Sequence, residues 1–140
     1  MAVKVKRIEH IGLAIKDPKA ALEFWSKHLG LQLTHTEDVP SDAVKTYFLP
    51  VGETQIELLE ATSPDSPVQK FIDKRGTGIH HLCIEVENLS ELLNKMKRDG
   101  VTLINDSPRP GAHGYQVAFV HPKSTGGILL ELSEKLKTKS

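Results

Sequence analysis

Two stretches of the chain alternate apolar residues with polar or small ones. They are IEHIGLAI, which begins at Ile8, and IHHLCIEV, which begins at Ile79. A repeat of two residues is typical of a β-strand that buries one face. A helix-like run follows each stretch and ends at Gly30 in the first case and at Gly100 in the second. Glycine often follows the last turn of a helix, because it adopts the left-handed conformation without strain. The pattern predicts two strand–helix units.

Each unit continues with further strand-like segments. A short apolar segment follows each glycine, and then come AVKTYFLPV and TQIELLEA in the first unit and GYQVAFVHP and GGILLELSE in the second. The sequence therefore predicts two β-α-β-β-β modules, at about residues 5–61 and about residues 78–135. Residues 66–75 are predicted to form a linking helix, and Asp17 and Asn88 to be the N-caps of the two module helices. This organisation predicts an α+β fold in a single domain.

Composition and charge narrow the choice of partners and compartment. The chain has 18 basic and 18 acidic side chains, so its formal net charge is zero. A nucleic-acid-binding domain usually has a basic excess, and no run is long and apolar enough to span a membrane, so we expect neither partner. The single cysteine, Cys83, excludes an internal disulfide and suits a reducing compartment. The first residues become strand-like at once, without the features of a signal or transit segment. We expect a cytoplasmic protein.

The repeat places four chemically active side chains in equivalent positions. His10 aligns with His81, and Glu57 aligns with Glu131. Neighbouring residues of a strand face opposite ways, so His80 cannot share a site with His81. A strand histidine or glutamate taken singly is usually structural or solvent-exposed, but the paired occurrence favours a shared site. A buried carboxylate needs a partner, and imidazole with carboxylate suits a divalent ion such as Co, Mn, Ni, Zn or Fe.

Three other features have less direct interpretations. His80 is predicted to be a structural residue on the helix-packing face of its strand, and Cys83 a small apolar filler. The loop SPRPGAHGYQ joins two predicted strands and is rich in glycine and proline. Loops at the ends of sheets often hold binding groups. His113 and the adjacent Gly114 are therefore candidates for substrate binding, with a simple turn as the alternative.

Four segments occur together in one order: IEHIGLAIKD, GIHHLCIEV, GAHG and VHPKSTGGILLEL. In this order the chain resembles the vicinal oxygen chelate superfamily over about residues 8–133, and within it most closely the methylmalonyl-CoA epimerase family. The resemblance implies a cupped, roughly eight-stranded mixed sheet around one divalent metal ion per chain, a small-molecule acyl-CoA substrate and a homodimer. Some members of the family have glutamine at the position of Glu57. The metal ligands that the resemblance implies are His10, Glu57, His81 and Glu131.

The resemblance also implies a reaction, the interconversion of the two C2 epimers of methylmalonyl-CoA through an enolate. A metal ion chelated by the substrate would polarise the thioester carbonyl. Inversion takes a proton from one face and returns one to the other, so it needs two acid/base groups. Glu131 is one candidate. Lys45 stands about where some members have a glutamate, and it could act if burial lowered its pKa; a metal-bound water or a residue of another loop is the alternative.

Two other functions are compatible with the same fold. A glyoxalase I-like isomerase also uses four metal ligands, but the segment LLEATSPDSPVQKFIDKRG after Glu57 is unlike the one expected in that enzyme. A drug-resistance protein of this fold binds its ligand without catalysis. Such proteins often lack a complete set of metal ligands, so the four residues together favour an enzyme of the isomerase class.

Overall fold

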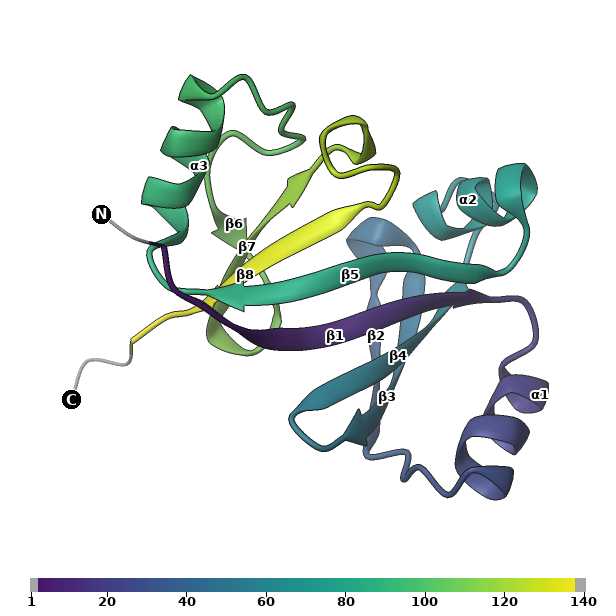
Figure 1. The fold of residues 1–140 in the computed structure, drawn as a ribbon. Helices are drawn as coiled ribbons and strands as arrows, with labels where there is room; N and C mark the ends of the chain where they lie inside the picture. Colours follow the sequence, from purple (N-terminus) through teal and green to yellow (C-terminus); the bar gives the residue numbers. More distant parts are fainter. Residues whose placement is uncertain (1–2, 138–140) are drawn as a thin grey trace. The chain divides into compact units, whose positions relative to one another are not determined.

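The computed structural model describes residues 3–137 and divides into two compact units. The central unit is His10–His80, and the terminal unit combines Met1–Glu9 with His81–Ser140. The division passes through two strands, β1 (Val5–Ile15) and β5 (Gly78–Val86). The order of elements confirms the predicted α+β class and the two β-α-β-β-β modules (Figure 1). Within residues 3–137, no helix is both long enough and apolar enough to cross a membrane.

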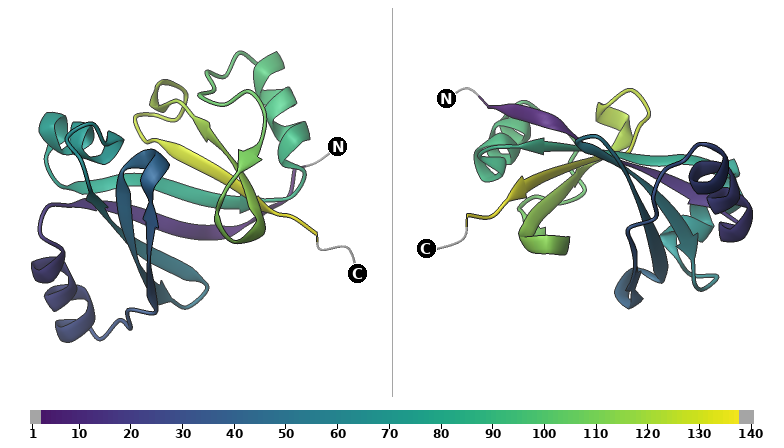
Figure 2. Two further views of the ribbon diagram at one scale, coloured as in Figure 1. Left: turned by 180° about the vertical axis from the view of Figure 1, so that it is seen from behind. Right: turned by 90° about the horizontal axis from the view of Figure 1, so that it is seen from below.

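The central unit contains a sheet in the order β2-β3-β4-β1. β1 runs parallel to β4, whereas the β2–β3 and β3–β4 pairs are antiparallel; the β3–β4 hairpin can be followed in both views of Figure 2. The other elements of the unit, in chain order, are α1 (Pro18–Leu22), the π-helical turn η1 (Glu23–His28), β2 (His35–Val39), the 3-10 turn η2 (Pro40–Asp42), β3 (Val44–Val51), β4 (Thr54–Ala61) and α2 (Pro67–Arg75).

The first module helix begins and ends where the sequence predicts. The side chain of Asp17 accepts a hydrogen bond from the backbone N–H of Ala20 at 3.2 Å, as expected of an N-cap. Gly30 has a φ of 92°, the left-handed conformation that a residue with a side chain adopts only with strain. The short strand predicted directly after this glycine is absent, because Leu31 and Leu33 pack as irregular chain against the core, and β2 begins only at His35.

Helices cover both faces of the central sheet. Leu13 and Ile15 pack with the first helix, as their alternation predicts, in a cluster that includes Leu58 and Trp25. Ala14 points the opposite way, on the same face as His10, and packs with residues of α2. The linking helix thus closes one end of the face that presents His10. The sequence pattern does not reveal this, because the alternation of β1 reports burial but not the covering element.

The strands of the terminal unit lie in the order β5-β8-β7-β6. β5 and β8 are parallel, and the β7–β8 and β6–β7 pairs are antiparallel. The short strand predicted after Gly100 is only an isolated bridge between Leu103 and Val120. The elements are β5, α3 (Leu89–Arg98), β6 (Arg109–Pro110), the 3-10 turn η3 (Ala112–Gly114), β7 (Tyr115–Val120), the 3-10 turn η4 (Pro122–Ser124) and β8 (Leu130–Lys135).

The start of α3 differs from the prediction. Asn88 occupies the N-cap position with φ at 58°, and its side chain makes no capping hydrogen bond. Glu134 of β8 replaces it, because its carboxylate accepts hydrogen bonds from the backbone N–H groups of Asn88 at 2.8 Å and of Leu89 at 3.0 Å. The apolar face of α3 packs through Leu89 and Leu93 on Leu132 of the sheet. A contact between distant parts of the chain therefore caps this helix.

Candidate functional site

The central unit contains one histidine and one glutamate of the predicted set of four, and they lie side by side. His10 Nδ1 lies 3.2 Å from Glu57 Oε2, and the residues are 7% and 9% exposed. The parallel register of β1 and β4 pairs Glu57 with Gly12, two residues beyond His10. Because glycine has no side chain, nothing on β1 projects directly beside the Glu57 carboxylate. On the other side, Phe48 of β3 pairs with Glu57. The strands alone therefore bring the two polar groups together in a largely dry position.

The terminal unit contains the second pair in an equivalent arrangement. His81 Nε2 lies 3.3 Å from Glu131 Oε1. Glu131 of β8 pairs with Cys83 of β5, two residues beyond the histidine, and with Phe119 of β7. The ring of Phe119 packs edge-on against the ring of His81, with centroids 6.2 Å apart. The repeat in the sequence is thus a repeat in strand register, down to the phenylalanine beside each glutamate.

Each pair offers the donor atoms that a divalent metal ion prefers. A buried carboxylate is costly unless a charge or hydrogen-bond donor compensates it, and here an imidazole nitrogen stands within 3.3 Å in each unit. Neutral imidazole nitrogen and carboxylate oxygen are common ligands of Zn, Co, Ni and Mn. The residues of each unit therefore fit half of a metal site that has two nitrogen and two oxygen ligands.

His80 and Cys83, the residues of β5 that were predicted to be structural, both pack within the protein. His80 packs against Phe71 of α2 with ring centroids 5.0 Å apart, in the central unit. Cys83 is 0% exposed, and its thiol donates a hydrogen bond to Ser133 Oγ at 3.4 Å. Small side chains on β5 and β8 thus follow the His81–Glu131 pair along the same face.

The structure does not support a catalytic role for Lys45. In β3, Lys45 pairs with Glu60, whereas Phe48 pairs with Glu57, so the lysine and Glu57 lie on opposite faces of the sheet. The Lys45 ammonium instead lies 5.3 Å from the centre of the Tyr47 ring, on the face that packs on the first helix. The catalytic role of Lys45 stays a prediction; its neighbours in β3 lie on the other face, because a shift of one residue in a strand reverses the face.

The candidate substrate-binding loop lies at the start of β7. His113 is exposed and has φ 57° and ψ 35°, a left-handed conformation that few residues with side chains adopt. Gly114 accepts a hydrogen bond from the N–H of Leu136 at 3.0 Å. Tyr115, which follows, is four residues before Phe119 on β7, so the loop stands roughly 13 Å along the strand from the rung of Glu131. The substrate-binding role of His113 and Gly114 stays a prediction.

A buried charged cluster in the terminal unit was not predicted. Glu85 is 4% exposed and accepts a hydrogen bond from Arg7 Nε at 2.9 Å, with Lys6 Nζ at 3.5 Å. The hydroxyl of Tyr115 donates to the same carboxylate at 3.4 Å. Burial, and then the nearby Glu85 charge, raise the pKa of the Tyr115 phenol. Glu85 shares a face with His81 and Cys83, so the alternation of β5 could have drawn attention to it.

The match to a protein-family model identifies the superfamily of this chain. The chain belongs to the Glyoxalase/Bleomycin resistance protein/Dioxygenase superfamily, whose family model matches residues 9–119. The relatives are more specific. The mitochondrial methylmalonyl-CoA epimerase of Mus musculus is 36% identical over 132 residues, which cover 94% of this chain and 74% of that protein. The uncharacterized protein YqjC of Bacillus subtilis (strain 168) is 39% identical over 130 residues, which cover 93% of each chain.

A solved structure extends the likeness to the fold. The structure described as methylmalonyl-CoA epimerase in complex with methylmalonyl-CoA and NH4+ matches with a TM-score of 0.86 and 32% identity, over 97% of this chain and 99% of that one. These findings confirm the predicted superfamily and the predicted resemblance to methylmalonyl-CoA epimerases.

Proposed function

We infer that this protein is a methylmalonyl-CoA epimerase, an isomerase that interconverts the two C2 epimers of methylmalonyl-CoA. The observation that supports this most directly is the match of nearly the whole chain to epimerases in both sequence and structure. The chain also has a histidine and a glutamate at equivalent places in both modules.

We propose that His10, Glu57, His81 and Glu131 hold one divalent ion. The support is the pair in each unit, buried and with nitrogen and oxygen within 3.3 Å of each other. When bound, such an ion polarises the thioester carbonyl and stabilises the negative charge that develops as the C2 proton leaves. The buried positions of the protein ligands keep them in place and limit competition from water.

We propose that Glu131 also moves a proton at C2. Its carboxylate belongs to the buried His81–Glu131 pair, which is part of the proposed metal site. Inversion requires a second acid/base group on the other face of the enolate. Lys45 is the candidate from the sequence, but it faces the helix side of the central sheet. A metal-bound water or a residue of another loop is the alternative.

The remaining features of the proposal concern binding and assembly. His113 and Gly114 are proposed to contact the acyl-CoA substrate from the loop before β7. A homodimer and a cytoplasmic location also belong to the proposal; the single cysteine suits a reducing compartment. A glyoxalase I-like isomerase is the alternative enzyme of the same superfamily, and a binding protein without catalysis is the alternative outside enzymes.

One experiment separates these functions. Protein loaded in turn with cobalt, manganese, nickel and zinc is incubated with one epimer of methylmalonyl-CoA in deuterated water. We expect deuterium at C2 and an approach to equal amounts of the two epimers. The hemithioacetal of methylglyoxal and glutathione is the parallel substrate for the glyoxalase alternative. Background exchange with all four metals would rule out the epimerase, and ligand binding without turnover of either substrate would indicate the binding protein.

A further inference from the structure

We propose that His35, the first residue of β2, is the second acid/base group of the epimerase; this rests on the function proposed above. One proton transfer at C2 then belongs to Glu131 and the other to His35. Imidazole is the side chain whose charge changes near neutral pH, and it is the most frequent general acid or base in enzymes. Its place in the central unit also suits the role.

Strand pairing sets His35 in the same row of the central sheet as Glu57. Phe48 of β3 pairs with His35 on one side and with Glu57 on the other, so the three side chains project from one face. Two strand spacings, about 10 Å, separate the backbones of His35 and Glu57, a distance that a methylmalonyl group held between the two side chains can bridge. His10 projects from this face, whereas Lys45 projects from the opposite one.

The linking helix α2 covers a different part of this face. The buried residues that pack together there are Ala14, Val44, Leu59, Val68 and Ile72. Those that belong to strands all lie beyond the row of Glu57 in the direction of β4. The buried apolar cluster at α2 therefore ends before that row. His35 itself is exposed, so a substrate can reach its ring.

Hydrogen bonds assign the nitrogen of the His35 ring that carries the hydrogen. The Thr34 hydroxyl donates to the backbone carbonyl of Phe48 at 3.3 Å, which uses its single hydrogen. The same oxygen lies 3.2 Å from His35 Nδ1, so this nitrogen is the donor between them. In the neutral ring, Nε2 is then the basic nitrogen. The ring stacks on that of Phe48, with 4.1 Å between centroids and 7° between planes, which holds its orientation.

This arrangement supports a balanced proton transfer. For one epimer, Nε2 of His35 forms an N–H bond as the C2–H bond breaks, and the electron pair moves into the thioester carbonyl to give the enolate. The carboxylic acid form of Glu131 then returns a proton to the other face of C2. For the other epimer the two groups exchange roles. Between turnovers, exchange with water restores the starting protonation state of both groups.

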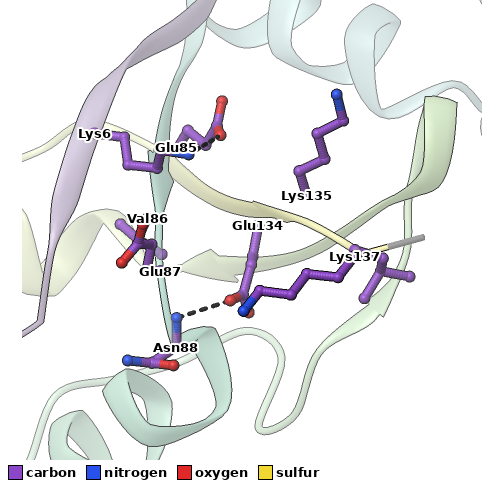
Figure 3. A pocket seen from close by; sticks show the side chains of 9 residues that line it. Lys6, Glu85, Val86, Glu87, Asn88, Glu134, Lys135 and Lys137 are labelled. Atoms are coloured by element: carbon purple, nitrogen blue, oxygen red, sulfur yellow. Dashed lines mark hydrogen bonds and ion pairs between the residues drawn. The ribbon is translucent and has the colours of Figure 1, made fainter. Parts of the chain in front are cut away.

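The carboxylates around the pocket of the terminal unit are engaged within the protein. Glu85 pairs with Lys6 at 3.5 Å, and Glu134 accepts a hydrogen bond from the backbone N–H of Asn88 at 2.8 Å (Figure 3). These contacts give both carboxylates a structural role. His35 is supported by its position in the row of Glu57 as well as by its chemistry.

The test compares His35→Gln with the control His28→Gln in the metal-loaded protein. Both histidines are exposed side chains of the central unit, and His28 lies on η1. Each epimer is supplied separately in deuterated water. We expect His35→Gln to keep its metal but to epimerise about 10²–10⁴-fold more slowly. One epimer should still exchange its C2 proton, because Glu131 can remove it and return a deuteron on the same face. His28→Gln should behave like the wild type.

Exogenous imidazole gives a second test, because position 35 is open to solvent. In His35→Ala, added imidazole should restore part of the epimerisation rate in proportion to its concentration. The wild type should not respond.

A third measurement does not depend on turnover. Nitrogen-15 NMR of the metal-free protein distinguishes the two ring nitrogens of His35, whose signals are those missing from His35→Gln. We expect the hydrogen on Nδ1 in the neutral ring, and its partial transfer to Nε2 in Thr34→Val, which lacks the hydroxyl. A wild-type ring with its hydrogen on Nε2 would contradict the assignment.

The outcomes distinguish the role of His35 from the function on which it rests. Epimerisation at the wild-type rate in His35→Gln, equal loss of exchange for both epimers, or loss of metal from this variant would overturn the role of His35 and leave the epimerase in place. If the wild type neither epimerises nor exchanges the C2 proton, the proposed function fails, and the role of His35 fails with it.

Discussion

Single residues in this protein act through contacts that depend on strand register. Tyr47, Lys45 and Glu60 lie on one face of the central sheet because β3 and β4 pair as they do, while Glu57 lies on the other. The hydroxyl of Tyr47 donates a hydrogen bond to Glu60 at 2.7 Å. Burial, and then this hydrogen bond, raise the pKa of Tyr47 to about 12. The phenol is therefore held in its neutral form on the helix-packing side of the sheet.

This shift predicts how stability responds to alkaline pH. A phenol with a pKa near 10 in the unfolded chain and about 12 in the folded one stabilises the fold below pH 10 and loses this effect as pH rises towards 12. We expect the free energy of unfolding of the wild type to fall more steeply over this range than that of Tyr47→Phe. Urea denaturation at several pH values measures the slopes, and tyrosinate absorbance follows the ionisation.

The comparison needs a control because the chain has a second shifted tyrosine. The pKa of Tyr115 is also raised, so Tyr115→Phe should keep the part of the decline that belongs to Tyr47. Parallel slopes for wild type and Tyr47→Phe would contradict the assignment.

At Gly111 a side chain is excluded by lack of space and not by the backbone conformation. A Cβ atom at this position would lie 2.8 Å from Val117 Cγ1, closer than van der Waals contact permits. Valine is branched at Cβ and has few alternative rotamers. We expect Gly111→Ala to destabilise the protein by roughly 1–3 kcal/mol, the usual range for overpacking. Chemical denaturation provides the measurement.

The opposing methyl group offers the control for this prediction. In the double variant Gly111→Ala/Val117→Ala the methyl group that clashes is gone, so the two substitutions together should cost less than the sum of their separate effects. Full additivity would mean that the two side chains do not meet.

At the scale of elements, the ends of helices depend on different kinds of contact. α1 is capped by the side chain directly before it, Asp17, as a local pattern predicts. α3 is capped by Glu134, a residue of the last strand. The left-handed conformation of Asn88 places its own side chain where it makes no such bond. The first turn of α3 therefore has its backbone N–H groups bonded only when β8 is in place.

Because Glu134 caps α3, its substitution should lower the stability of the protein. Glu134→Ala should destabilise the protein by about 1 kcal/mol, as for other N-cap removals. Glu134→Gln keeps one acceptor oxygen and should lose less. The amides of Asn88 and Leu89 should exchange with solvent faster in both variants, which hydrogen exchange by NMR can follow.

Glu91 supplies the control for the cap. It is exposed in the first turn of α3, so Glu91→Ala changes the charge near the helix start by the same amount without removing the two hydrogen bonds. Its effect should be limited to a few tenths of a kcal/mol. Equal losses for Glu91→Ala and Glu134→Ala would show that charge alone explains the effect.

At the scale of the whole molecule, the proposed metal site would link ligand binding to folding. An ion that binds the folded chain but not the unfolded one stabilises it by about 2.7 kcal/mol at a free concentration one hundred times Kd. His81 belongs to the buried pair with Glu131, whereas His80 contacts Phe71. The two adjacent histidines therefore have different roles in the proposal.

Substituting each histidine tests that difference. His81→Ala should lose bound metal and its Tm should no longer rise when cobalt is added. His80→Ala should lower Tm by the loss of its ring contact, worth about 1 kcal/mol, but should keep both the metal and the cobalt-dependent rise. Metal content after dialysis and thermal denaturation with and without cobalt are the measurements, and equal metal loss in both variants would contradict the assignment of faces.

Much of the fold and both halves of the site could be predicted from sequence because they depend on local periodicity. A repeat of two assigns His81 and Cys83 to one face and His80 to the other, and the duplication of the module aligns His10 with His81 and Glu57 with Glu131. Within each module, the structure brings the histidine to within 3.3 Å of the glutamate. Periodicity suffices here because side-chain direction in a strand is a property of the backbone itself.

Tertiary structure decided the features that depend on which segment meets which. The face of Lys45, the capping of α3 by Glu134 and the cluster around Glu85 all follow from strand pairing between residues far apart in the chain. The local sequence pattern indicates which positions are buried, but it does not indicate which segment covers them. The sequence by itself therefore determined the two modules and their four aligned histidines and glutamates, and only the folded chain determined which side chains these residues contact.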